Sequence, residues 1–265
     1  MKITAVSEAH AAYLRRIRRD ARVVFFSRIA VLLGFLLLWE IGADLRWFDP
    51  FILSSPSRVL LTVVRLYRDG SLWLHVGTTL LETVLGFVLG TVLGALIAVL
   101  LWWMPKLNRV LDPYLVVLNA LPKIALGPVL IVWIGAGMAS IVVMGVLVSL
   151  VVTTVTVLNG FLAATDEKQL LMRTLGATKL QIFTKVVLPA GIPDLISALK
   201  ISVGMSWVGV IVGEYLVSKA GLGYLIVYGG QVFKLDLVMA SVTILCVLAA
   251  LMYYAVAFLE KKVRR

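Results

Sequence analysis

The sequence has one cysteine and two histidines among 265 residues, and only 15% of its residues are charged. A single cysteine cannot form an intramolecular disulfide, and Cys246 lies in an apolar run where thiols are seldom reactive. Neither His10 nor His75 has partners at the spacings of zinc sites. The chain lacks the G-x-x-x-x-G-K-[ST] motif that holds ATP phosphates, and no serine–histidine–acid arrangement is evident. These absences argue against a metalloenzyme, an ATPase and a hydrolase, and predict that the chain binds no metal or cofactor.

Apolar residues dominate the composition. They make up 61% of the chain, and the mean hydropathy is +1.02, whereas soluble domains have roughly 45–50% apolar residues. No polar stretch approaches the ~50 residues that a compact soluble domain needs. The composition therefore predicts an all-α, multi-pass membrane protein.

Six apolar runs are long enough to cross a membrane, because a hydrocarbon core about 30 Å thick requires roughly 20 apolar residues in a helix. The third run contains Pro122 and Pro128, which interrupt regular helix. We therefore expect six transmembrane helices, at residues 23–45, 74–103, 111–134, 140–162, 192–216 and 235–259.

Basic residues mark one side of the predicted bundle. The net charge is +11, and lysines and arginines gather in the N-terminal tail, after the second span, between the fourth and fifth spans, and at the C-terminus. Such clusters mark the cytoplasmic side and attract anionic lipid headgroups. We therefore expect cytoplasmic basic ends at residues 1–22 and 261–265 around a transmembrane domain at 23–260. The positive charge then reflects topology and not nucleic-acid binding.

One basic stretch, residues 55–70, falls on the opposite side. It begins with serines and Pro56 and ends at Gly70, which are helix start and stop signals. Polar and apolar residues occupy opposite stripes, so the helix is amphipathic. We expect it either to lie on the outer membrane interface or to pack on the bundle. The polar stripe is Arg58, Thr62, Arg65 and Asp69, and the apolar one is Val59, Leu60, Val63 and Leu66.

Small residues recur at every fourth position in two spans. The second span contains Gly86, Gly90 and Gly94, and the fifth contains Gly209 and Gly213. This spacing allows helix backbones to approach closely in lipid. It predicts tight helix packing, either within one chain or between two copies.

Five ionisable residues, Glu82, Lys123, Asp194, Lys200 and Glu214, lie in or beside the apolar runs. A charge facing lipid costs a few kcal/mol, so these side chains should face protein, water or the interface. Lys123 lies in the proline-broken span, and broken helices often line a cavity. Glu214 lies near the outer end of the fifth span. We predict that Lys123 and Glu214 line a substrate pathway; the alternative for each is an interhelical hydrogen bond or snorkelling to the interface.

The segment at residues 163–189 is polar but has a helical pattern. Leu170, Leu171 and Leu175 are spaced as on one helix face, Gly176 follows, and Leu188-Pro189 precede the fifth span. An ordinary linker seldom carries such a pattern. It indicates a short helical element that docks against something outside the membrane.

This segment also carries a family signature. In membrane subunits of ABC importers, Glu-Ala-Ala is followed by three residues, a glycine, nine residues and Ile-x-Leu-Pro. Here nine residues separate Gly176 from Val-Val-Leu-Pro at 186–189, while Leu-Leu-Met at 170–172 departs from Glu-Ala-Ala. Residues 51–60, 121–137 and 213–226 resemble the nitrate, sulfonate, taurine and bicarbonate branch of these permeases. The resemblance covers nearly all of residues 30–260.

The resemblance implies a type I ABC importer permease-like bundle in a bacterial plasma membrane, with both termini cytoplasmic. A second permease copy, as a homodimer, would complete the pathway. Cytoplasmic ATPase subunits would bind ATP and Mg²⁺, and an extracytoplasmic solute-binding protein would deliver the substrate. A helix at 165–185 would lie in a groove of the ATPase, with basic residues facing acidic groove edges, a turn at the glycine, and a proline ending the segment. The implied coupling residues are Leu170, Leu171, Arg173, Leu175, Gly176, Lys179, Leu180, Leu188 and Pro189.

Two other functions are compatible with a multi-pass membrane protein. A secondary transporter should have paired carboxylates within the membrane and internal repeats, and repeats are not evident. An integral membrane enzyme that acts on lipid should have a polar catalytic cluster at an interface, and none is seen. For the permease, Lys123 and the basic outer helix favour a small organic anion such as a sulfonate, although related permeases also serve neutral heterocycles.

Overall fold

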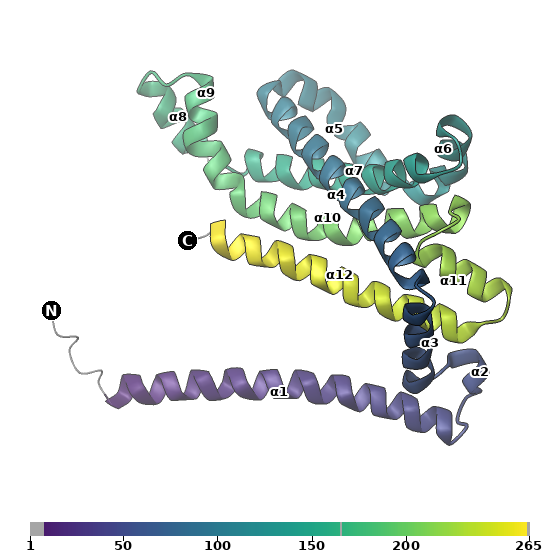
Figure 1. Ribbon diagram of the computed structural model, residues 1–265. Coiled ribbons are helices and arrows are strands. Elements are labelled where there is room, and N and C mark those ends of the chain that lie inside the picture. The colour runs from purple at the N-terminus through teal and green to yellow at the C-terminus, as the bar shows by residue number, and fades with distance from the viewer. Residues whose placement is uncertain (1–7, 165, 264–265) are drawn as a thin grey trace.

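The structure is a computed structural model that describes residues 8–164 and 166–263, and this part of the chain contains helices and no strands. Five helices are long and apolar enough to cross a membrane, and a bent pair of helices brings the number to six, which confirms the predicted fold class (Figure 1). The five long helices are α1 (Glu8–Asp44), α4 (Ser71–Trp103), α7 (Met138–Leu162), α10 (Leu188–Val217) and α12 (Leu235–Val263).

The sixth crossing is the bent pair. Helix α5 (Pro105–Ala120) is followed by the 3₁₀ turn η1 (Lys123–Leu126) and by α6 (Gly127–Ile134), and the bend between the two halves is 86°. The break falls at Pro122, as the sequence predicts. Pro128 instead lies in the first turn of α6, where a missing backbone N–H is tolerated, so it does not break the helix.

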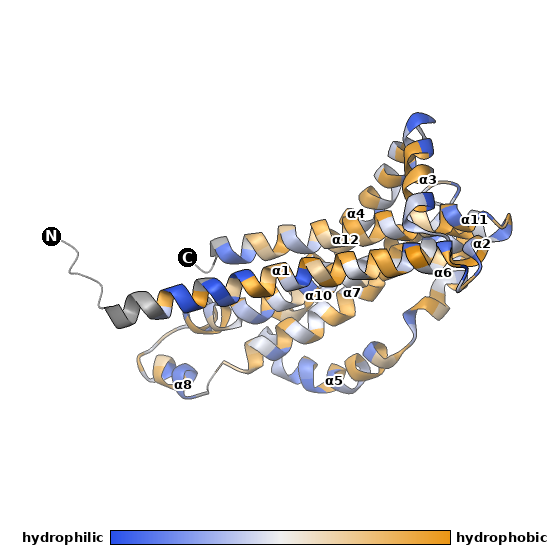
Figure 2. Ribbon diagram, turned by 90° about the horizontal axis from the view of Figure 1, so that it is seen from below, coloured by the Kyte–Doolittle hydropathy of each residue, from blue (hydrophilic) through white to orange (hydrophobic). Residues whose placement is uncertain are grey.

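Short helices lie at the two ends of the long ones. At one end, together with the beginning of α1 and the end of α12, are α8 (Asp166–Thr174) and α9 (Lys179–Ile182). Towards the other end, which we call the outer end, are α2 (Pro50–Leu53), α3 (Pro56–Arg68) and α11 (Leu222–Gln231) (Figure 1). Figure 2 shows hydrophilic residues near the beginning of α1 and on α8, and apolar residues along the long helices.

The centre of the bundle is α7, which packs between α4 and α10. A Cβ on Gly86 of α4 would lie 3.3 Å from the Cα of Gly145 on α7, and one on Gly209 of α10 would lie 2.8 Å from the same atom. The glycine pattern therefore packs helices within one chain, which decides between the two alternatives left by the sequence.

Hydroxyl groups link the same three helices. Ser149 Oγ donates to the Gly86 carbonyl at 3.4 Å, and the hydroxyls of Thr153 and Ser202 are 2.6 Å apart. These side chains are fully buried. Close packing and interhelical hydrogen bonds are the forces that hold helices together where lipid supplies no hydrophobic drive between them.

Helix α1 is the exception to this packing. It contacts α2 and α3, and none of its most apolar 18-residue window is buried. Its polar anchor is Glu40, whose carboxylate accepts from the backbone N–H of Ser57 at 2.9 Å and from the Ser57 hydroxyl at 2.6 Å. Glu40 thus caps the N-terminus of α3 and ties α1 to it.

Helix α3 packs on α12, α4 and α1. Val59 on its apolar side is buried, whereas Leu60 and Leu61 are exposed. Packing on the bundle, one of the two predicted arrangements, is therefore what the structure contains.

Candidate functional site

The segment at residues 163–189 consists of two short helices and a continuous junction with α10, not one helix at 165–185. Helix α8 ends in a Schellman motif: Ala177 N–H donates to the Met172 carbonyl at 2.9 Å, and Gly176 N–H to the Arg173 carbonyl at 3.0 Å. Gly176 has φ +79°, a conformation that disfavours residues with a Cβ. No atom lies within 4 Å of a Cβ built there, so the glycine serves a turn and not a close approach.

The second short helix begins with a capping box. Thr178 accepts from the backbone of Gln181, whose side chain bonds back to the backbone of Thr178, so two free N–H groups are satisfied. Helix α9 then runs through the π-helix η2 (Phe183–Val187) into α10. Pro189 therefore does not end the segment: it lies in the first turn of α10, where proline is tolerated. The residues from 179 to 217 form one continuous helical rod.

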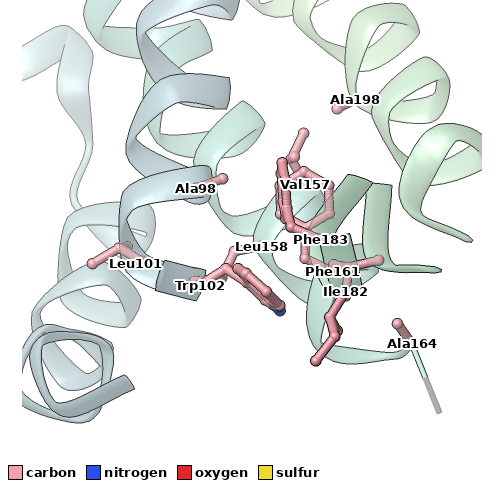
Figure 3. Packing of buried hydrophobic residues seen from close by; sticks show 11 residues of the cluster. Ala98, Leu101, Trp102, Val157, Leu158, Phe161, Ala164, Ile182, Phe183 and Ala198 are labelled. Carbon is pink, nitrogen blue, oxygen red and sulfur yellow. The ribbon is translucent and has the colours of Figure 1, made fainter. Parts of the chain in front are cut away.

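An aromatic cluster attaches this rod to the bundle. Phe183 lies 5.0 Å from Trp102 and 5.6 Å from Phe161, measured between ring centroids. Figure 3 shows these rings meeting Ile182 and Val157 between α4, α7 and the segment. Because the cluster is buried, a force on the segment is transmitted to α4 and α7 through packed side chains.

Four leucines of the segment are exposed among its charged side chains. Leu170, Leu171, Leu175 and Leu180 are 62%, 60%, 73% and 58% exposed. The short helices that carry them are anchored at the aromatic cluster and capped at Thr178, so the leucines are presented on a fixed backbone. Large apolar side chains exposed on a polar segment make it a candidate for contact with another protein.

Two basic residues of the segment differ in their surroundings. Lys179 Nζ donates to the Trp103 carbonyl and lies 5.8 Å and 5.4 Å from the ring centroids of Trp102 and Trp103, so its charge is directed towards α4. Arg173 is exposed. Both border a cavity of about 380 Å³ between the segment, α4 and α5. Both side chains are exposed, but only Lys179 is bound to a backbone carbonyl of α4, so Arg173 is the freer of the two for the implied contact with an acidic group.

Lys123 lies at the bend between α5 and α6. Its Nζ donates to the Asn119 carbonyl at 3.0 Å and so satisfies a free carbonyl of the last turn of α5. Beyond the bend, Val132 and Trp133 on α6 are 82% and 78% exposed. The lysine is therefore held at a break in the helix. The backbone carbonyls beside it would accept intrahelical hydrogen bonds if the helix were continuous.

Glu214 is buried at the N-terminus of α11. It is 1% exposed, and its carboxylate accepts from Gly223 N–H at 2.6 Å. The neighbouring N–H groups of Gly221 and Leu222 donate to His75 Nδ1 at 3.0 Å and to Thr79 Oγ1 at 2.7 Å. Side chains of α4 and α10 thus accept hydrogen bonds from the free N–H groups at the start of α11. The partial positive charge of this helix N-terminus favours a negative group such as the Glu214 carboxylate.

Glu82 completes this cluster. It is 1% exposed, and its carboxyl contacts that of Glu214. Two buried carboxyl groups in contact repel each other when both are ionised, so we expect one of them to hold a proton. From the sequence, Glu82 is one of five ionisable residues in or beside the apolar runs, and its connection with His75, Thr79 and Glu214 was missed. The spacing of His75, Thr79 and Glu82 on one face of a helix was the signal for a shared role.

Comparison with known proteins assigns the class. Residues 90–265 match the family described as binding-protein-dependent transport system inner membrane component, and the chain belongs to this family. Its class is therefore that of ABC transporter permeases.

Individual relatives are named as permeases, and a solved structure has a similar fold. The chain is 35% identical to a probable ABC transporter permease protein of Haemophilus influenzae (84% of this chain, 91% of that protein). It is 31% identical to the formylaminopyrimidine transport permease ThiX of Halalkalibacterium halodurans (85% and 89%) and 23% identical to the taurine permease TauC of Escherichia coli (88% and 87%). The fold is similar to a chain of the MetNI methionine ABC transporter, solved in inward-facing conformations, with a TM-score of 0.64 and 23% identity over 73% of this chain and 98% of that one.

Proposed function

We propose that this permease is driven by a separate cytoplasmic ATPase that docks on the segment at residues 163–189. The observation that carries the proposal is the combination of an exposed leucine face and an aromatic anchor behind it. Leu170, Leu171, Leu175 and Leu180 are exposed on α8, on the turn after it and on α9. Phe183, directly after α9, contacts α4 and α7. A helix-in-groove contact needs such an apolar face on a fixed element. ATP and Mg²⁺ would be bound by the partner chain.

The leucine face can be tested by co-purification. We expect Leu171→Asp to abolish recovery of the ATPase encoded beside the permease, because the charge would be buried in the groove. Lys261→Asp is the matched control: Lys261 is exposed at the same end of the molecule but outside the segment. Equal recovery of the ATPase with both variants would contradict the proposal.

We infer that two copies of this chain form the pathway, as a homodimer in a bacterial plasma membrane with both termini in the cytoplasm. Apolar side chains on α5 and α6, including Val116, Val117 and Trp133, are exposed. The basic residues at the beginning of α1 and on α8 lie at the same end of the molecule (Figure 2), as the rule for cytoplasmic positive charge requires. A solute-binding protein would then act at the outer end.

For the substrate we propose a small organic anion such as a sulfonate. The support is Lys123, a cation at a break in a membrane helix, where pathways are commonly built. The names of relatives include both taurine and formylaminopyrimidine permeases, so a neutral heterocycle is the competing class. Uptake of radiolabelled taurine, competed by unlabelled sulfonates or by pyrimidines, separates the two.

The paired carboxyls of Glu82 and Glu214 are a feature that the sequence analysis expected of a secondary transporter. Here Glu214 accepts a hydrogen bond from the N-terminus of α11, and Glu82 contacts Glu214. Family membership favours the ABC permease. We propose that Glu214 acts on the pathway by holding α11 in place, and not by contact with substrate.

A further inference from the structure

A cleft lined by both apolar and charged residues lies at the outer end, where α3 meets the loop between α11 and α12. Its volume is about 370 Å³. The polar stripe of α3 forms one wall, with Arg58 and Arg65, and Phe233, Lys234 and Asp236 form the other. Asp236 is the one acidic residue among the side chains that line it, so its charged groups are mainly basic.

The floor of the cleft is fixed. Arg58 donates to Asp236 Oδ2 through Nε at 3.2 Å and through Nη2 at 2.9 Å, and to the Pro50 carbonyl at 2.8 Å. Asp236 Oδ1 accepts from the Ser54 hydroxyl at 2.7 Å. The Asp236 carboxylate is therefore fully engaged, and it neutralises Arg58.

The remaining charge is not neutralised within the described chain. Neither Arg65 nor Lys234 forms an ion pair there, and both are exposed. Basic residues are disfavoured on the outer side of membrane proteins. Two unneutralised cations at the outer end therefore point to an acidic partner.

Phe233 supplies an apolar contact beside these cations. It occupies the left-handed position after α11, with φ +56°, where glycine is usual. Lys234 N–H bonds back to the Gly229 carbonyl at 2.8 Å, which completes the turn. Phe233 is nevertheless 70% exposed. Within the chain alone, the left-handed backbone and the exposure of an aromatic side chain are both unfavourable. Their combination at Phe233 points to a binding role.

The opposite side of α3 is apolar. Leu60 and Tyr67, which lie across the helix from Thr62, are exposed, and this is the side suited to lipid. The cleft with its cations therefore faces away from the lipid-facing residues. This arrangement favours a protein partner over a lipid headgroup.

We propose that this cleft docks an acidic protein surface that carries an exposed apolar side chain. The proposal rests on the proposed importer function, under which the partner is the extracytoplasmic solute-binding protein. Arg65 and Lys234 steer the acidic surface, and Phe233 forms the apolar contact.

The test measures binding of the solute-binding protein encoded beside the permease to the complete permease–ATPase complex in nanodiscs, at low and high salt. We expect the double variant Arg65→Glu/Lys234→Glu to weaken binding at least tenfold and to remove the loss of affinity that salt causes in the wild type. Lys219→Glu, an exposed cation in the loop before α11, is the control and should bind like the wild type. Equal affinity and salt dependence of the double variant would overturn the proposal.

A second variant separates docking from folding. Phe233→Gly relieves the left-handed strain, so we expect an unchanged or higher melting temperature together with at least tenfold weaker docking. Unchanged docking would remove Phe233 from the interface and contradict the proposal. A wild-type complex that binds the solute-binding protein at no salt concentration would instead refute the proposed importer function.

Discussion

At the residue scale, two acidic side chains cap helices that belong to other parts of the chain. Glu40 caps α3 and Glu214 caps α11. Sequence reasoning identifies Glu214 as a carboxyl that must avoid lipid. It does not identify the partner, because Gly223 and Thr79 come from other elements and meet Glu214 only when α4, α10 and α11 pack together.

Glu214 and Glu82, the buried acids beside the start of α11, should respond differently to substitution by glutamine. Glu214→Gln replaces a carboxylate that accepts backbone N–H groups by an amide whose added donors lack acceptors beside Gly221, and should destabilise the fold by about 1–3 kcal/mol. Glu82→Gln should be neutral or stabilising, since its amide can donate to Glu214. The melting temperatures of the purified proteins test this contrast, and equal destabilisation by both would argue against the capping role.

Lys123 gives a second prediction at this scale. Lys123→Gln removes the cation at the bend, and we expect anion uptake to fall at least tenfold while the melting temperature changes little, because its hydrogen bond to the Asn119 carbonyl is exposed. Lys123→Arg keeps the charge and should retain most of the uptake. Proteoliposome uptake of taurine measures both. Undiminished uptake by Lys123→Gln would remove this lysine from the pathway.

At the scale of elements, the long helices follow from the sequence and the junctions do not. Apolar length predicts the spans, and Pro122 predicts the bend between α5 and α6. The continuous rod from α9 to α10 was missed because Pro189 was interpreted as a stop, whereas the π-helix at Phe183–Val187 carries the chain into the first turn of α10. A π-turn leaves no simple periodicity in the sequence.

The glycines of α10 allow a matched test of helix packing. A Cβ on Gly209 would lie 2.8 Å from the Gly145 Cα and the Met144 carbonyl, whereas nothing lies within 4 Å of one on Gly204. We expect Gly209→Ala to destabilise the protein by about 1–3 kcal/mol. Gly204→Ala should be neutral, or stabilising by up to about 1 kcal/mol. Thermal unfolding in detergent distinguishes them, and similar melting temperatures would contradict the packing account.

At the scale of the whole molecule, one chain leaves much apolar surface without a partner. Helix α1 is held at its end by Glu40 and is otherwise exposed. Apolar side chains on one side of α5 and α6, such as Val117 and Trp133, are exposed as well. The sequence predicts six spans but not this open arrangement, because apolar residues that face lipid and those that face a second copy have the same composition.

A symmetric dimer can be detected by disulfide formation between identical residues, which meet only near a two-fold axis. In a Cys246→Ser background we expect Val117→Cys on α5 to form a covalent dimer on oxidation. Val31→Cys on α1, 74% exposed, serves as the comparison and should stay monomeric. The reverse pattern on a denaturing gel would place the two-fold axis elsewhere.

The central claim is that movement of an ATPase reaches the bundle through the segment at residues 163–189. The most direct test is ATP hydrolysis stimulated by the solute-binding protein, in proteoliposomes with the wild type, Gly176→Ala and Gly176→Trp. Both variants carry the same left-handed backbone strain, about 1 kcal/mol. Only tryptophan adds a large side chain, and no other atom of this chain lies within 4 Å of the Cβ position from which it projects. We predict that Gly176→Ala retains stimulation and that Gly176→Trp loses both the complex and the stimulation. Full stimulation with Gly176→Trp would contradict the account.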